Sequence, residues 1–143
     1  MSGKPTGGGT FKFTGTATDV VGNPAVTAFG PLNIDMLAPA DALLSTPNVG
    51  AVTATEPTFT WSRNRSKETS GYEHYDVQVL IGGSWRNVAS VPYPANPPDS
   101  FSAARNPAVM ANPLPERTPL QWRVMTWDNA GNSKGSSARA FTI

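Results

Sequence analysis

The motif D-x-x-G-N occurs twice in this chain of 143 residues, at positions 19–23 and 128–132. The two copies lie 109 residues apart, and apolar positions on both sides of the motif coincide when the chain is shifted by that distance. The coinciding residues are Phe11 with Leu120, Phe13 with Trp122, and Leu32–Ile34 with residues 141–143. Alternating apolar residues on either side of a turn are typical of half-buried strands. The repeat therefore predicts an all-β module about 100 residues long, the size of an antiparallel sandwich.

The same spacing predicts where this module begins. One full period that ends at Ile143 starts at Asp35, so we expect a β-sandwich over residues 35–143. Residues 1–34 then correspond to the last two strands of a preceding module. Because two strands alone are marginally stable in water, we expect the apolar residues of this hairpin to be buried against the main domain, another chain or a domain outside this fragment.

The composition excludes several classes of partner and site. The formal net charge is +1, which argues against nucleic acid and against a cation-rich partner. There is no cysteine, so neither a disulfide nor a thiolate metal site is expected. No apolar run reaches the roughly 20 residues of a membrane helix. The N-terminal residues lack a secretory signal, so we expect either a fragment of a longer secreted protein or a protein that is not secreted.

Two stretches of the sequence show the clearest strand-like alternation of side chains between two faces. In Y-D-V-Q-V-L-I-G-G-S-W, Tyr75, Val77, Val79 and Ile81 share one face. Gly82–Gly83 supply a two-residue hairpin turn that pairs Leu80 with Trp85 on the opposite face. In L-Q-W-R-V-M-T-W, one face carries Leu120, Trp122, Val124 and Thr126, and the other carries Arg123, Met125 and Trp127. Both stretches predict strands of a sandwich.

Other segments are less regular. Residues 38–50 predict an irregular entry or edge strand, with a short helix over residues 40–44. Residues 91–115 are too proline-rich for a central strand and predict one or two short edge strands at most.

Several of these residues resemble a known family. Trp61, then Y-D-V-Q-V, then Trp85, then Q-W-R-V-x-x-x-D-x-A-G-N and F-T-I, resemble bacterial fibronectin type III-like domains. Residues 16–39 resemble the end of a bacterial Ig-like repeat and its linker. The resemblance implies that the strands containing Tyr75, Trp85 and Trp122 lie in one sheet with the last strand. It also implies a spacer or binding module of a multidomain extracellular or cell-surface bacterial protein, with neighbouring Ig-like modules as partners.

Three aspartates have two interpretations. Asp19, Asp35 and Asp128 belong to turns and a linker of the kind that hold Ca²⁺ between some bacterial Ig-like repeats. Calcium requires six to eight oxygen ligands, and the turn at Asp128 offers no second acid. The favoured interpretation is an Asx-type turn, in which the carboxylate accepts backbone N–H groups. We therefore expect no cofactor, with calcium as the alternative.

Aromatic residues on the outer face of the predicted sheet are the candidate binding surface. In the resembled fold, Leu80, Trp85, Met125 and Trp127 gather there with Arg123. Such residues are favoured in interfaces, and exposed aromatics stack on sugar rings. The alternative is that a covering loop or a one-residue register slip buries them.

The predicted function is a non-catalytic structural, spacer or adhesion module, with a carbohydrate- or protein-binding module as the alternative. Catalysis is not expected, because the sequence contains no G-x-S-x-G, no H-E-x-x-H and no phosphate-binding glycine loop. His74 has Glu73 and Asp76 nearby, but neighbours in a strand point to opposite faces, so no relay is expected there.

Overall fold

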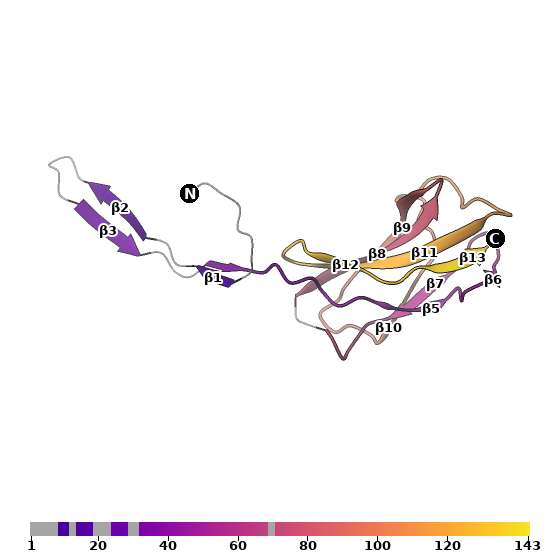
Figure 1. Ribbon diagram of the computed structural model, residues 1–143, viewed down its shortest axis with the longest axis horizontal. Coiled ribbons are helices and arrows are strands. Elements are labelled where there is room, and N and C mark those ends of the chain that lie inside the picture. The colour runs from indigo at the N-terminus through magenta and orange to yellow at the C-terminus, as the bar shows by residue number, and fades with distance from the viewer. Residues whose placement is uncertain (1–8, 12–13, 19–23, 29–31, 69–70) are drawn as a thin grey trace. The chain divides into compact units, whose positions relative to one another are not determined.

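The computed structural model describes residues 9–11, 14–18, 24–28, 32–68 and 71–143, and its side chains from Ile34 onward (Figure 1). The chain divides into two compact units, Met1–Leu37 and Ala38–Ile143. In the first unit, β1 (Gly9–Phe11) pairs with β4 (Leu32–Ile34), and β2 (Thr14–Thr18) pairs with β3 (Pro24–Ala28); both pairings are antiparallel. The side chains of Phe11 and Leu32 and the whole of Phe13 lie outside the described residues, so their expected burial stays a prediction.

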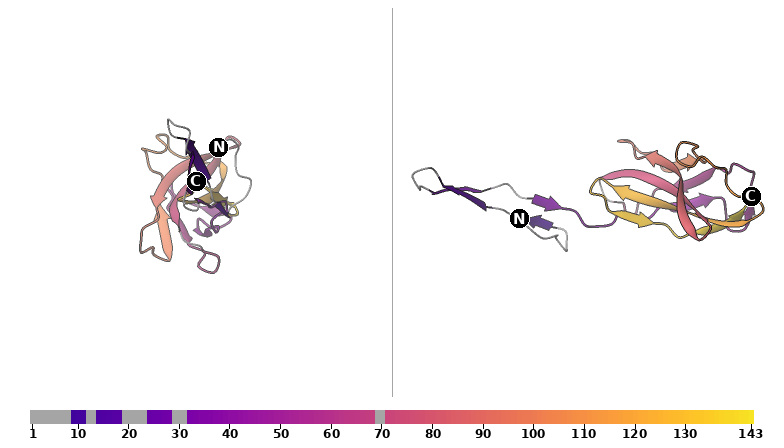
Figure 2. Two further views of the ribbon diagram at one scale, coloured as in Figure 1. Left: turned by 90° about the vertical axis from the view of Figure 1, so that its left-hand side faces the viewer. Right: turned by 90° about the horizontal axis from the view of Figure 1, so that it is seen from above.

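The second unit is an all-β sandwich, which confirms the predicted fold class; its strands pair antiparallel except β6, which pairs parallel with β13. The smaller sheet has the order β10-β7-β5, and the larger has the order β6-β13-β11-β8-β9 with β12 also paired to β11 (Figures 1 and 2). The strands are β5 (Leu43–Thr46), β6 (Ala51–Val52), β7 (Phe59–Ser62), β8 (Tyr72–Ile81), β9 (Ser84–Pro92), β10 (Ser100–Ala103), β11 (Pro119–Asp128), β12 (Ser133–Gly135) and β13 (Arg139–Thr142). The expected sheet of β8, β9, β11 and β13 is therefore present. Within the described residues, no helix is long and apolar enough to cross a membrane.

Aromatic rings from the two sheets form the core. Phe59 of β7 lies against Trp122 of β11, with ring centroids 5.1 Å apart, and Trp61 meets Tyr75 edge-on at 5.6 Å. The face of β11 predicted to be internal is buried at all four positions. The alternation of β7 and β11 thus directs large apolar side chains into one interior, where aromatic burial contributes most of the stabilisation.

The β8–β9 hairpin has the predicted register. Leu80 pairs with Trp85 and Ile81 with Ser84. Gly82 and Gly83 have φ values of 59° and 81°, which this two-residue turn requires and which glycine adopts without strain. Further along, Val77 pairs with Ala89 and Gln78 with Asn87, so Val88 is an extra residue in a β-bulge.

The predicted helix over residues 40–44 is wrong. Leu43 and Leu44 begin strand β5, which pairs with β7 at the edge of the smaller sheet. Before it, the Ala40 N–H donates to the Tyr72 hydroxyl at 2.7 Å. After it, the Trp122 indole N–H donates to the Pro47 carbonyl at 3.0 Å. Pairing with β7 and these tertiary contacts override the local helix propensity, and the irregular edge strand predicted for this segment is confirmed.

The proline-rich middle of the chain forms little regular structure, as predicted. Its strand β10 is short and lies at a sheet edge. The segment that follows β10 covers the hairpin: the Asn106 N–H donates to the Val88 carbonyl at 2.7 Å, and Leu114 is buried in the core. Arg105 anchors this segment by donating to the carbonyls of Met110 and Ala111.

Candidate functional site

The turn after β11 is built around the carboxylate of Asp128, which is 5% exposed. One oxygen, Oδ1, accepts the backbone N–H groups of Ala130 and Asn132 at 2.9 and 2.8 Å. The other, Oδ2, accepts the Asn132 side-chain amide at 3.0 Å. Gly131 has a φ of 87°, a conformation that favours glycine. Both oxygens are thus engaged inside the turn, in the arrangement that the D-x-x-G-N motif favours.

The other two candidate calcium ligands, Asp19 and Asp35, belong to the first unit of the chain. Asp19 lies outside the described residues. Asp35 is exposed and its Oδ1 accepts the Leu37 N–H at 3.0 Å, a contact within the first unit. In the described ranges, no three His, Asp or Glu side chains lie close enough together to hold a metal ion.

Trp85 and Arg123 form the first of two clusters on the outer face of the larger sheet. Trp85 lies on the edge strand β9 and is half-buried, and the guanidinium carbon of Arg123 lies 4.2 Å from its ring centroid. Arg123 Nε donates to Gln78 at 2.8 Å, and the Gln78 amide donates to Asn87 at 2.8 Å. The cluster combines one aromatic ring with a row of oriented polar groups, which is a chemistry suited to polar ligands such as sugars.

Trp127 and His74 form the second cluster. Their rings are stacked, with centroids 5.9 Å apart and an interplanar angle of 13°. The imidazole also lies 3.4 Å from the carboxylates of both Glu73 and Asp76. The sequence predicts no relay here and does not anticipate the contact with Asp76, which is two residues from His74 and shares its face of β8. Trp127 Nε1 is buried, and no described group accepts its hydrogen.

Met125 lies between the two clusters along β11 and is half-buried. It pairs with Gly135 of β12, and a side chain at position 135 would meet the Met125 sulfur at 2.9 Å. Because residue 135 is a glycine, the Met125 side chain can pack directly over its backbone.

The two tryptophans of the outer face lie at different places along the larger sheet, and the binding role expected of this face stays a prediction. Trp85 pairs with Leu80, whereas Trp127 pairs with His74, six residues further along β8. At a rise of about 3.3 Å per residue, the strand positions of the two tryptophans are roughly 20 Å apart, with Met125 between the clusters. Both tryptophans are half-buried rather than fully exposed. Sequence alternation identified the correct face but gave no information on how far apart its aromatic residues lie.

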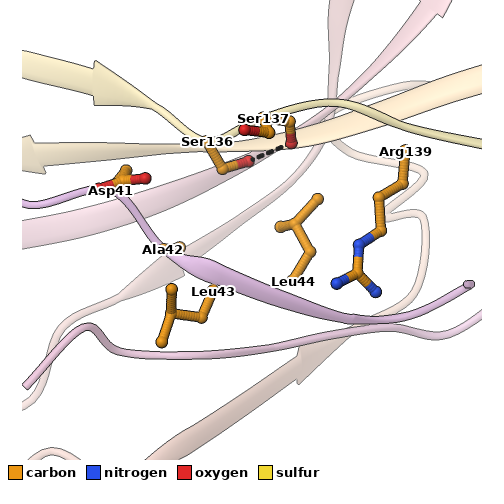
Figure 3. Close-up of a pocket in the computed structure, with 7 residues that line it drawn as sticks. All are labelled: Asp41, Ala42, Leu43, Leu44, Ser136, Ser137 and Arg139. Atoms are coloured by element: carbon orange, nitrogen blue, oxygen red, sulfur yellow. Dashed lines mark hydrogen bonds between the residues drawn. The ribbon is translucent and has the colours of Figure 1, made fainter.

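Two cavities lie away from these clusters. One, of about 210 Å³, separates β5 from the segment leading into β13 (Figure 3). Arg139 lines it and donates to the Ser45 carbonyl at 2.8 Å, so this guanidinium connects the two sheets. The other, of about 420 Å³, is lined by residues 46–58, and its one acid, Glu56, is bound by Arg105 at 2.8 Å. Arg139 and Glu56, which line these cavities, take part in contacts that hold the fold together.

Comparisons with known proteins agree with the fold. A structure of the fibronectin(III)-like modules of Clostridium thermocellum CbhA superposes with a TM-score of 0.57 at 14% sequence identity. The match covers 95% of this chain and 63% of the CbhA chain, so this chain spans less than two thirds of the length of that structure. At this identity the likeness shows the fold alone. A search of curated proteins gave no match.

A family profile accounts for most of the sandwich. The profile of the Rha78A-like, N-terminal immunoglobulin domain matches residues 45–143, from the edge strand β5 to the C-terminal residue. The chain therefore belongs to the family of Rha78A-like N-terminal immunoglobulin domains.

Proposed function

We propose that this chain supplies a non-catalytic structural module that spaces or joins neighbouring domains of a multidomain bacterial protein at the cell surface or outside the cell. Its partners are the neighbouring Ig-like modules, and adhesion is one use of such an assembly. The family describes an N-terminal domain, which supports the presence of further domains in the same protein.

The path of the chain through the sandwich is the observation that carries this proposal. The chain enters the second unit beside Tyr72, which pairs with Asp128 at one end of β11. It reaches Thr142, which pairs with Pro119 at the other end (Figure 1). Because β11 has ten residues, entry and exit are about 30 Å apart along the strand. A module that is entered at one end and left at the other extends a linear array.

The hydrogen bonds and ion pairs that polar side chains make within the fold support a structural role. The Asp128 carboxylate is held within its turn, and Arg105 binds Glu56 and two carbonyl groups. These contacts satisfy buried or half-buried polar atoms, which stabilises the fold.

Recognition of a carbohydrate or a protein is the second candidate function, and the Trp85 cluster is the observation that favours it. Its aromatic ring and its row of Arg123, Gln78 and Asn87 lie on an open sheet face. The Trp127 cluster is a weaker candidate, because His74 stacks on that indole.

Two measurements separate the candidates. Spin labels at Ala130→Cys and Thr118→Cys, near opposite ends of β11, are introduced cleanly because the chain has no cysteine. A spacer predicts one narrow distance distribution that is unchanged when folded reporter domains are fused to both chain termini. Broadening on fusion would contradict the spacer role. On a glycan array, saturable binding that is lost in Trp85→Ala and kept in Trp127→Ala would instead establish recognition.

A further inference from the structure

The two units of this chain share a strand-pairing register, beyond the sequence motif that they have in common. In the first unit, β2 pairs with β3 through Thr16–Val26, Ala17–Ala25 and Thr18–Pro24. Adding 109 to each number gives the three pairs between β11 and β12: Met125–Gly135, Thr126–Lys134 and Trp127–Ser133. The inner hairpin of the first unit therefore has the register of the inner hairpin of the sandwich.

The agreement extends past the turn. In the first unit, β1 pairs with β4 through Thr10–Asn33 and Phe11–Leu32. The same shift of 109 gives Pro119–Thr142 and Leu120–Phe141, which are pairs between β11 and β13. In both units the register of the outer pair of strands (β1 with β4, and β11 with β13) is offset by one residue from the register of the inner pair (β2 with β3, and β11 with β12).

This displacement carries the argument. A shared turn motif is enough to set the register of the strands next to it, since turn type and loop length fix the register of a hairpin. It does not dictate a one-residue displacement several residues further along both strands. Such irregularities are kept within structural families, so their coincidence indicates equivalent elements.

We infer that β1 to β4 are closing strands of a second Ig-like sandwich, and that the edge of β1 and β2 with which no described strand pairs is an acceptor for a β8-type strand. In the sandwich, β11 has β12 and β13 on one side and β8 on the other. In the first unit, β3 and β4 occupy the side that corresponds to β12 and β13. Among the described residues of that unit, no strand occupies the side that corresponds to β8.

The occupant is an extended segment from the preceding part of the same polypeptide, with the alternating apolar and polar residues of β8, running antiparallel to β2. A second copy of β8 is a poor source, because β8 already pairs on both edges, with β11 and with β9. A two-stranded hairpin is marginally stable by itself, so adding the strand stabilises β1 to β4. This inference goes beyond the spacer role, which concerns residues 38–143.

Register-specific disulfide trapping tests the inference. Met125 pairs with Asp76, so position 16 corresponds to the partner of position 76. The full chain carrying Thr16→Cys is incubated in glutathione redox buffer with a synthetic peptide of residues 72–81 carrying Asp76→Cys. We expect a mixed disulfide to form several-fold faster than in two controls. One control is the chain with Thr27→Cys, on β3. The other is the peptide with Val77→Cys, in which the cysteine is moved by one residue, so that its thiol points to the opposite face of the sheet.

Each outcome decides the matter. Preference for the matched pair over both controls supports the acceptor edge. Equal rates in all three reactions would overturn it, because they show random collision of thiols. Predominant linkage of two Thr16→Cys chains would also overturn it, by showing that a second copy of the hairpin covers this edge.

Discussion

The guanidinium carbon of Arg123 lies 4.2 Å from the ring centroid of Trp85. This contact joins the edge strand β9 to the central strand β11 across β8, because Arg123 also donates to Gln78 of β8. The outer face of the larger sheet is therefore connected across three strands at this point. The guanidinium therefore covers part of one face of the indole ring.

A double-mutant cycle of Trp85→Ala and Arg123→Ala measures this contact. At a half-buried site we expect a coupling free energy of about 0.5–1 kcal/mol in urea unfolding. Gln78→Ala serves as the matched control, since it removes the hydrogen bond to Arg123 and leaves the indole in place. Coupling of zero would show that the guanidinium does not interact with the ring in solution.

Asp128→Ala is expected to lower the free energy of unfolding by about 2–3 kcal/mol, because two backbone N–H groups and one side-chain amide lose a carboxylate acceptor. The readout is the urea midpoint at constant m value. Asp128→Asn keeps one acceptor oxygen, so its loss should be smaller. Equal losses for the two variants would show that the charge, and not the acceptor geometry, stabilises the turn.

Calcium offers an independent measurement on the same turn. Because both oxygens of Asp128 are engaged within the turn, we expect millimolar Ca²⁺ to leave the melting temperature unchanged. Magnesium at the same concentration controls for ionic strength. A rise in melting temperature with Ca²⁺ alone that disappears in Asp128→Ala or in Asp19→Ala would establish a calcium site instead.

Local pattern was enough to predict the hairpin of β8 and β9 and the internal face of β11, because each depends on alternation and on turn residues that are adjacent in sequence. Residues 40–44 were predicted as a helix because their partners, β7 and Tyr72, are distant in sequence. The contact of His74 with Asp76 was missed for a different reason: only adjacent neighbours in the strand were considered. The anchoring role of Arg105 has no sequence signal, since Glu56 is 49 residues away.

Arg105→Ala is expected to destabilise the fold by about 2–3 kcal/mol, because the Met110 and Ala111 carbonyls and Glu56 lose their donor. Arg105→Lys should recover little of this, since the donors of an ammonium group lie on one nitrogen and lack the planar fork that reaches Glu56 on one side and the two carbonyls on the other. Hydrogen exchange at Asn106, which bonds to Val88, reports whether the covering segment loosens first. Full recovery by lysine would contradict this geometry.

Alkaline pH should destabilise the sandwich through Tyr75. The side chain is 1% exposed, and burial, followed by the nearby Glu68, raises the pKa of its hydroxyl well above the ordinary value of 10.0. The folded state therefore favours the neutral phenol. This contribution to stability is complete below the unfolded-state pKa of about 10 and is lost as the pH rises above it, by up to about 1.4 kcal/mol per pH unit.

Tyr75→Phe should flatten the decline in unfolding free energy between pH 9.5 and 11.5, measured in urea, whereas Tyr93→Phe, a half-buried control, should retain it. The same decline in wild-type protein and Tyr75→Phe would show that another group controls the alkaline transition.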